Sequence, residues 1–224
     1  RPQAGPPGRL PARLEVRELQ EPSLALASAT REVMRVADLV DHMLRMVGEA
    51  SRRGDPVATR SVREAEERVD ALYVALKHYL AQTPRQPLQA AELCRGEELM
   101  AFLIAAEQAG DRIERMLLDL EAKMLVPRHA YPARAKAEIL ALHEKLAQNL
   151  QLAAGLCLER RLPAAVSLAA AREAFRDMER SFCAAHVARL VDGDPASVAI
   201  SSLHLDLLAD LAQMNDQACA FARF

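Results

Sequence analysis

Four acidic residues form two pairs with the same internal spacing. Glu66 precedes Asp70 by four residues, and Glu107 precedes Asp111 by four residues. On an α-helix this spacing returns a side chain to the same face, so each pair would set two carboxylates along one stripe. Hard divalent or trivalent metal ions bind carboxylate oxygens, and two facing helices could supply four such groups. The pairs therefore suggest a metal-binding patch, although spacing alone favours an ordinary solvated helix face.

Motifs of several enzyme classes are missing from the sequence. There is no Gly-x-Ser-x-Gly elbow, no glycine-rich phosphate loop and no dinucleotide-binding fingerprint. None of the six histidines follows a glutamate by three residues, the spacing on which ferritin-type di-iron sites depend. In the sequence, His204 is close to Ser202 and Asp206, but this grouping indicates no catalytic role. We therefore predict that the chain is not an enzyme.

Composition narrows the class of protein further. The chain has 224 residues, 51% of them hydrophobic and only 4% aromatic. An alanine- and leucine-rich chain of this kind disfavours a β-sandwich or barrel. The 29 basic and 31 acidic residues nearly cancel, so no nucleic-acid partner is expected. No apolar run approaches the roughly 18 residues of a membrane-spanning helix, and no transmembrane segment is expected in this chain.

Long helices are the elements that would position the acidic pairs. Apolar residues recur every three or four positions in six segments, and this period is typical of amphipathic helices. Two glycine-aspartate-proline triplets, at 54–56 and 193–195, each supply a helix stop, a cap and a start. The segments cover residues 23–54, 56–84, 99–124, 139–156, 163–190 and 195–221.

The two sets of three helices suggest an internal duplication. Placing residues 63–65 over 172–174 aligns Asp70 with Glu179, and placing 110–111 over 215–216 aligns Asp111 with Asp216. The sequence therefore predicts an all-α fold of six long antiparallel helices arranged as two tandem three-helix bundles. The predicted parts are a Pro/Gly-rich linker or arm at 1–21, a first repeat at 22–127 and a second repeat at 128–224.

Two of the acidic segments resemble a known family. Residues 66–73 (EERVDALY) and 106–111 (AEQAGD) are similar to the two acidic helix motifs of PhoU domains. Residues 202–208 (SLHLDLL) and 30–33 (TREV) resemble, more narrowly, the PhoU-like tail of bacterial sodium/phosphate cotransporters. The resemblance extends from about Pro22 to the end of the chain.

The resemblance implies a function and a set of metal ligands. PhoU-like domains regulate phosphate uptake from the cytoplasmic side without catalysing a reaction, and some members bind metal ions at acidic clusters. Two acidic positions of the second half are apolar here, namely Phe175 and Ala212. The metal ligands implied by the resemblance are Glu66, Asp70, Glu107, Asp111, Glu179 and Asp216.

The resemblance also implies a location and partners. It places the chain in the cytoplasm, tethered to the inner face of the cell membrane when joined to a transporter. The expected partner is the membrane domain of a phosphate transporter or another protein, and a homodimer is also allowed. The alternatives that stay open are a structural helical adaptor without metal and a metalloenzyme built on the bundle. The sequence leaves open whether the chain is an excised domain or a free-standing protein.

Overall fold

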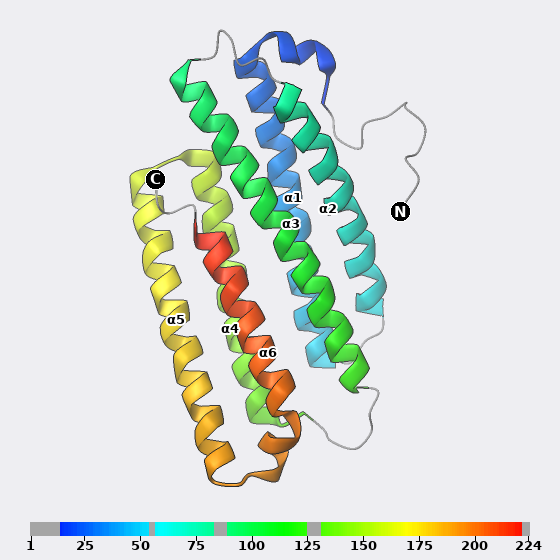
Figure 1. The fold of residues 1–224 in the computed structure, drawn as a ribbon, viewed down its shortest axis with the longest axis vertical. Helices are drawn as coiled ribbons and strands as arrows, with labels where there is room; N and C mark the ends of the chain where they lie inside the picture. Colours follow the sequence, from blue (N-terminus) through cyan, green and yellow to red (C-terminus); the bar gives the residue numbers. More distant parts are fainter. Residues whose placement is uncertain (1–13, 54–56, 83–88, 125–130, 221–224) are drawn as a thin grey trace.

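The structure, a computed structural model, describes residues 14–53, 57–82, 89–124 and 131–220. These ranges contain a short 3-10 helix, six long α-helices and no β-strand, so the predicted all-α bundle is confirmed. Each helix runs antiparallel to the one before it (Figure 1). The elements are η1 (Val16–Gln20), α1 (Pro22–Arg53), α2 (Val57–Gln82), α3 (Ala90–Met124), α4 (Ala133–Glu159), α5 (Leu162–Val191) and α6 (Pro195–Ala218).

The helices pack in two sets of three. In the first half, α1 packs against α2 and α3, and in the second half α4 packs against α5 and α6. The halves meet where α1 contacts α4 and where α3 contacts α6. The apolar positions predicted from the helical period, such as Val33 and Val36 in α1, are fully buried. We use "first half" and "second half" for these sets, and the predicted domain boundaries stay a prediction.

A buried histidine joins α1 to α4. The Nε2 atom of His143 donates a hydrogen bond of 2.5 Å to the backbone oxygen of Leu44. Gly48 makes room for the ring, because a Cβ atom at this position would lie only 2.7 Å from Cε1 of His143. On α3 and α6, Arg112 donates to Asp210 at 2.9 Å. The two halves therefore contact each other through specific polar groups as well as apolar packing.

The cap predicted at the start of the last helix is present. Asp194 accepts hydrogen bonds from the backbone nitrogen and the hydroxyl of Ser197, and Pro195 is the first residue of α6. Gly193 has a φ of 73°, a left-handed conformation that suits glycine. The matching triplet at 54–56 and the prolines predicted to end the second and third helices lie outside the described residues.

Three segments differ from the expectation: α4 begins at Ala133, six residues before the predicted start at 139, and the third helix and the arm also differ. The third helix begins at Ala90, nine residues before the predicted start at 99. Its first turns are polar, and they are capped by Glu92, whose carboxylate accepts from the backbone nitrogen of Gln89 at 3.0 Å. Within the predicted arm, Leu14 is buried and Leu19 packs against the core, while residues 1–13 lie outside the described ranges.

Candidate functional site

The two acidic pairs lie on neighbouring helices of the first half. Glu66 and Asp70 are one turn apart on α2, and Glu107 and Asp111 are one turn apart on α3. The two helices pack together, and Gly110 lies beside Val69, where a Cβ atom on the glycine would be in ordinary contact with Cγ1 of the valine at 3.6 Å. We call these four carboxylates the acidic patch: Glu66, Asp70, Glu107 and Asp111.

Three of the four carboxylates converge. One oxygen from each of Glu66, Asp70 and Asp111 lies within 4.8 Å of the other two. Glu66 is half-buried, whereas Asp70 and Asp111 are exposed. Glu107 lies outside this triple, and its pKa is raised by burial and then by the charges of Asp111 and Asp70, against the opposing charge of Lys77. The four carboxylates that the sequence suggested as one patch are therefore neighbours in the fold.

Burial and, after it, repulsion between like charges raise the pKa values of Glu66, Asp70 and Glu107 in the acidic patch. Burial, followed by the charges of Asp70, Glu114 and Asp111, raises the pKa of Glu66 to about 7. A proton held by Glu66 forms a hydrogen bond to Asp70, whose own pKa is raised by burial and by Asp111. Within the described ranges, the nearby ion pairs join Arg63 to Glu114 and Arg112 to Asp210, and none reaches the patch.

This geometry fits a hard cation. Ligand oxygens on opposite sides of a Ca²⁺ or Mg²⁺ ion lie about 4–5 Å apart, because each metal–oxygen distance is about 2.0–2.6 Å. The separations within the triple, up to 4.8 Å, are in that range. A cation would also remove the repulsion that raises the pKa of Glu66, and its binding would release the proton. Glu66, Asp70 and Asp111 are thus the residues that would hold a metal, with Glu107 beside them.

A family model matches the half that contains this patch. The PhoU domain model aligns with residues 33–119, from α1 to the later turns of α3. The similarity to the PhoU domain family therefore lies in the first half of the chain, at residues 33–119. The acidic patch lies wholly within the matched residues.

Longer relatives match nearly all of the chain. A Salmonella typhimurium protein named "Putative inorganic phosphate export protein YjbB" is 36% identical over 212 residues, which is 95% of this chain and 39% of the relative. The protein of the same name from Escherichia coli K12 is 34% identical over the same shares. The chain therefore spans about two fifths of the length of these relatives. No solved structure matches it significantly.

The acidic residues of the second half have different surroundings. Asp216 forms ion pairs with Arg172 at 3.0 Å and with Arg176 at 2.9 Å. Burial raises the pKa of Asp216, but the hydrogen bonds from the two arginines outweigh this and hold the pKa below its usual value. Glu179 instead accepts a hydrogen bond from the Cys183 thiol at 3.2 Å. Within the described residues, the only group of three or more metal-ligating side chains is the triple of the first half.

Sequence reasoning missed a buried polar cluster near the α5–α6 turn. His204 is fully buried, and its Nδ1 lies 2.7 Å from the Tyr131 hydroxyl. Its Nε2 lies 3.2 Å from Glu138, which also accepts two hydrogen bonds from Arg189. The His186 ring lies 4.6 Å from the His204 ring, centre to centre. The sequence grouped His204 with Ser202 and Asp206, whereas its partners in the structure come from α4, α5 and the segment before α4.

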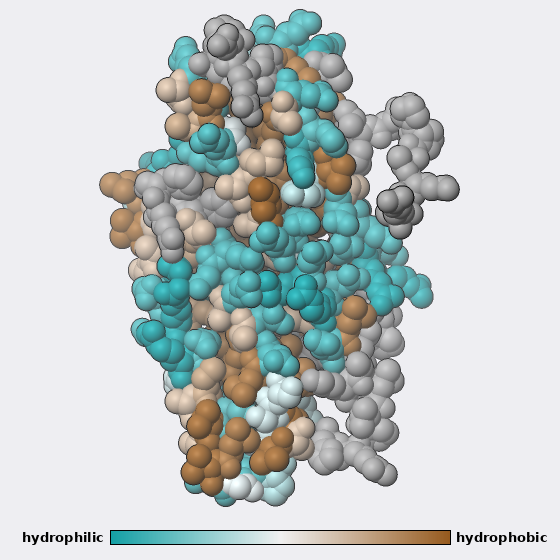
Figure 2. Space-filling model, viewed as in Figure 1, coloured by the Kyte–Doolittle hydropathy of each residue, from teal (hydrophilic) through white to brown (hydrophobic). Residues whose placement is uncertain are grey.

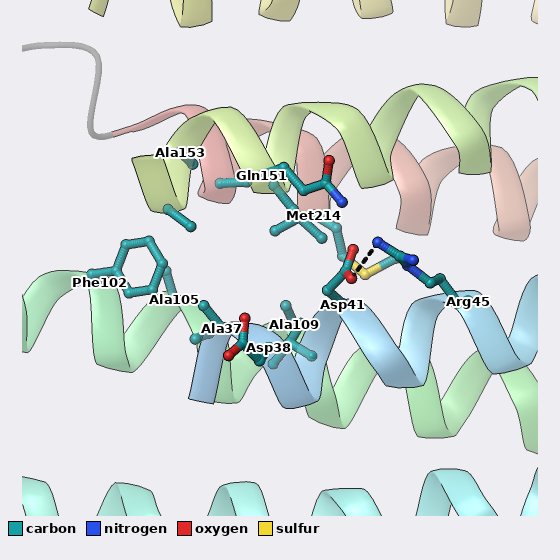
Figure 3. A pocket seen from close by; sticks show the side chains of 15 residues that line it. Ala37, Asp38, Asp41, Arg45, Phe102, Ala105, Ala109, Gln151, Ala153 and Met214 are labelled. Atoms are coloured by element: carbon teal, nitrogen blue, oxygen red, sulfur yellow. Dashed lines mark ion pairs between the residues drawn. The ribbon is translucent and has the colours of Figure 1, made fainter. Parts of the chain in front are cut away.

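The halves also enclose a small pocket, shown in Figure 3. Its volume is about 240 Å³, and its walls come from α1, α3, α4 and α6. Seven of the fifteen lining residues are alanines, and Phe102 and the ion pair between Asp41 and Arg45 (2.8 Å) also line the space. No residue of the acidic patch lines this pocket, so the candidate metal site and the pocket are separate features.

Proposed function

We propose that this chain is a non-enzymatic PhoU-like regulatory domain that controls the movement of phosphate across a membrane. The observation that carries the proposal is the match of 95% of the chain to relatives named for phosphate export, together with the PhoU match at 33–119. The resemblance implied uptake, whereas the name of the relatives specifies export. We therefore propose control of phosphate movement, with the direction decided by measuring both.

The proposed partner is a membrane domain of a phosphate transporter, acting at the cytoplasmic face. The relatives are much longer than this chain, which spans 39% of their length, so they contain a large part that this chain does not match. None of the described helices is long and apolar enough to cross a membrane. A regulator of this kind would act through protein contact, either within one longer polypeptide or as a separate subunit.

We further propose that a divalent or trivalent metal ion at the acidic patch modulates this contact. The support is geometric and electrostatic: three convergent carboxylates, a pKa of about 7 for Glu66 and no cationic side chain paired with the triple within the described ranges. A metal would tie α2 to α3. Because α3 carries Arg112, which reaches Asp210 on α6, fixing α3 would also bias the contact between the halves.

A metal titration tests this part of the proposal. Isothermal titration with Mn²⁺, Fe³⁺, Zn²⁺, Mg²⁺ and Ca²⁺ is compared for the wild type, Asp111→Asn and Asp216→Asn. We expect at least one ion to bind about tenfold or more weaker to Asp111→Asn, a difference of about 1.4 kcal/mol, and equally well to Asp216→Asn. The Asp216 variant is the matched control, because its carboxylate is already paired with two arginines.

Other outcomes of the titration select the alternatives. Equal, weak binding by all three proteins would leave a structural adaptor whose acidic patch is only solvated surface. Loss of binding in the Asp216→Asn protein as well would support the prediction that Glu179 and Asp216 are metal ligands. Oxygen or peroxide turnover after iron loading would favour the metalloenzyme instead.

A cellular experiment tests the role in phosphate movement. The chromosomal reading frame of the source organism is deleted, or changed to Asp111→Asn or Asp216→Asn, and uptake and efflux of radiolabelled phosphate are measured. We expect deletion and Asp111→Asn to change the flux in the same direction and Asp216→Asn to leave it at the wild-type level. Unchanged uptake and efflux after deletion would remove the phosphate proposal but not the metal site.

A further inference from the structure

The outward face of α5 is a continuous exposed stripe. In Figure 1 this helix forms one edge of the bundle. Nine exposed residues of α5 follow one another at intervals of three or four. They therefore share one face of the helix over the whole length of α5. The α5 stripe consists of Leu162, Val166, Ala169, Glu173, Asp177, Arg180, Ala184, Val187 and Val191.

The α5 stripe is apolar at its ends and charged in its middle. Leu162 and Val166 are 72% and 62% exposed at one end, and Val187 and Val191 are 50% and 81% exposed at the other. Figure 2 shows the same change along the edge formed by α5, with apolar colour at both ends and hydrophilic colour between them. Large apolar side chains this exposed at both ends of one stripe indicate a surface that a partner covers.

The order of residues along the α5 stripe is self-complementary. The midpoint of the α5 stripe lies between residues 176 and 177. Residues at equal distances on either side of this midpoint are of similar type at the two ends of the stripe. Leu162 mirrors Val191, and Val166 mirrors Val187. In the next positions Ala169 mirrors Ala184. An antiparallel copy of the helix would therefore set apolar residues against apolar residues and alanine against alanine.

The charged middle follows the same symmetry with opposite signs. Glu173 mirrors Arg180, so a two-fold axis at the centre would place each glutamate opposite an arginine of the other copy. In one copy, Glu173 lies 3.8 Å from Arg176, and Arg180 lies 2.5 Å from Asp177. Glu173 and Arg180 are exposed, and each can pair with its counterpart across the axis. A parallel arrangement would instead bring Glu173 against Glu173 and Arg180 against Arg180, which is repulsive.

We propose that the α5 stripe is the contact surface of a two-fold symmetric dimer, in which α5 packs antiparallel against α5 of a second copy. Such an isologous contact requires a patch that complements itself under rotation, and the α5 stripe meets that requirement. Ala169 and Ala184 would let the two backbones approach closely. The inference is independent of the proposed phosphate and metal functions.

The size of the contact sets its strength. The 30 residues of α5 extend about 45 Å at 1.5 Å per residue. A strip of this length and about 10 Å width buries about 450 Å² on each copy, or about 900 Å² in total, which falls among weak interfaces. The dimer should therefore form at high micromolar protein concentration and dissociate on dilution.

Disulfide cross-linking tests the orientation. In a Cys94→Ser, Cys183→Ser background, Leu162→Cys and Val191→Cys proteins are oxidised separately and as a mixture. The proposal predicts cross-linked dimers in the mixture only, because like positions would lie about 44 Å apart in the antiparallel pair. Cross-linking of either protein with itself as readily as in the mixture, or no cross-linking in the mixture, would overturn the proposal.

Sedimentation equilibrium tests the charge pairing without introduced cysteines. Glu173→Arg and Arg180→Glu should each weaken dimerisation about tenfold, and the double variant should restore it to about the wild-type level. Val74→Glu is the control, since Val74 is 53% exposed on α2, outside the α5 stripe. A wild-type protein that stays monomeric at 0.5 mM, or single charge variants that dimerise as well as the wild type, would contradict the proposed interface.

Discussion

The two halves of the molecule handle carboxylates at corresponding positions in opposite ways. In the first half, Glu66, Asp70 and Asp111 converge, and no cationic side chain pairs with them within the described residues. In the second half, Asp216, which the internal alignment places over Asp111, lies between Arg172 and Arg176. The pKa of Glu66 is raised to about 7, whereas the pKa of Asp216 is lowered.

This difference shows how one fold can hold both a site whose charge depends on bound protons or cations and a site whose charge is neutralised by its own side chains. Built-in arginines neutralise Asp216 permanently, so an external cation would have to displace them. Within the described residues no arginine or lysine forms an ion pair with Glu66, Asp70 or Asp111, so the stability of this triple depends on protons or on a bound cation. The following predictions test whether the two halves differ in this way.

The largest expected effect is stabilisation by metal. With a binding metal ion at a hundredfold excess over its dissociation constant, the free energy of unfolding of the wild type should rise by about 2.7 kcal/mol. Asp111→Asn should lose most of this gain, and Asp216→Asn should keep it. Urea denaturation with and without the ion measures both. If the two variants responded alike, the contrast between the halves would be wrong.

The buried cluster of the second half should make the protein sensitive to acid. Burial, together with the charges of His186 and Arg189, lowers the pKa of His204 from 6.5 to about 4. The folded protein then binds fewer protons than the unfolded chain, so this stability is present above pH 6.5 and is lost as the pH falls through about 4. After allowance for solvent screening, we expect a loss of about 2 kcal/mol.

Denaturation curves between pH 4 and pH 7 measure this loss, with His204→Gln as the comparison. The variant should be less stable near neutral pH and should depend less on pH. If the His204→Gln protein lost stability as steeply as the wild type when the pH falls, this loss would come from other groups.

The acidic patch should give the opposite pH dependence when no metal is present. Because the folded-state pKa of Glu66 is raised from 4.5 to about 7, its stabilising contribution is complete below pH 4.5 and is lost as the pH rises through about 7. Glu66 is only half-buried, so after discounting for solvent we expect about 1 kcal/mol. Glu66→Gln should remove this slope in chelator-treated protein. If the stability of the Glu66→Gln protein still depended on pH in the same way, the dependence would not come from Glu66.

The smallest expected effect comes from placing a cationic side chain beside the carboxylates of the first half, as the arginines beside Asp216 are placed in the second half. Glu66→Lys would place an ammonium group beside Asp70 and Asp111. We expect the metal-free protein to gain about 0.5 kcal/mol, because an exposed ion pair replaces a repulsion. Thermal denaturation with and without metal would check this gain, and the metal response should disappear. Retained metal stabilisation would show that the ion binds elsewhere.

Much of the fold could be predicted because helix period and capping are local properties. The buried valines of α1 and the Asp194–Pro195 start of α6 followed directly from residue order. The early start of α3 was missed because its first turns lack apolar periodicity. Glu92, which caps the backbone of Gln89, was the signal that could have indicated it.

The acidic patch could be anticipated only in part. Spacing put Glu66 with Asp70 and Glu107 with Asp111, since both members of each pair lie on one helix. That Glu66, Asp70 and Asp111 form the tight triple depends on how α2 and α3 pack. The arginines that neutralise Asp216 come from a different helix, so no spacing within α6 could have revealed them.

By itself, the amino-acid sequence determined which segments are helical and which face of each helix is apolar, because both depend on residues within a few positions of one another. Only the tertiary structure decided which charges meet, since Coulomb interactions and desolvation depend on distance in space and on burial. For this reason three carboxylates have three different environments: burial and neighbouring charges raise the pKa of Glu66, arginines neutralise Asp216, and Glu138 is buried against Arg189.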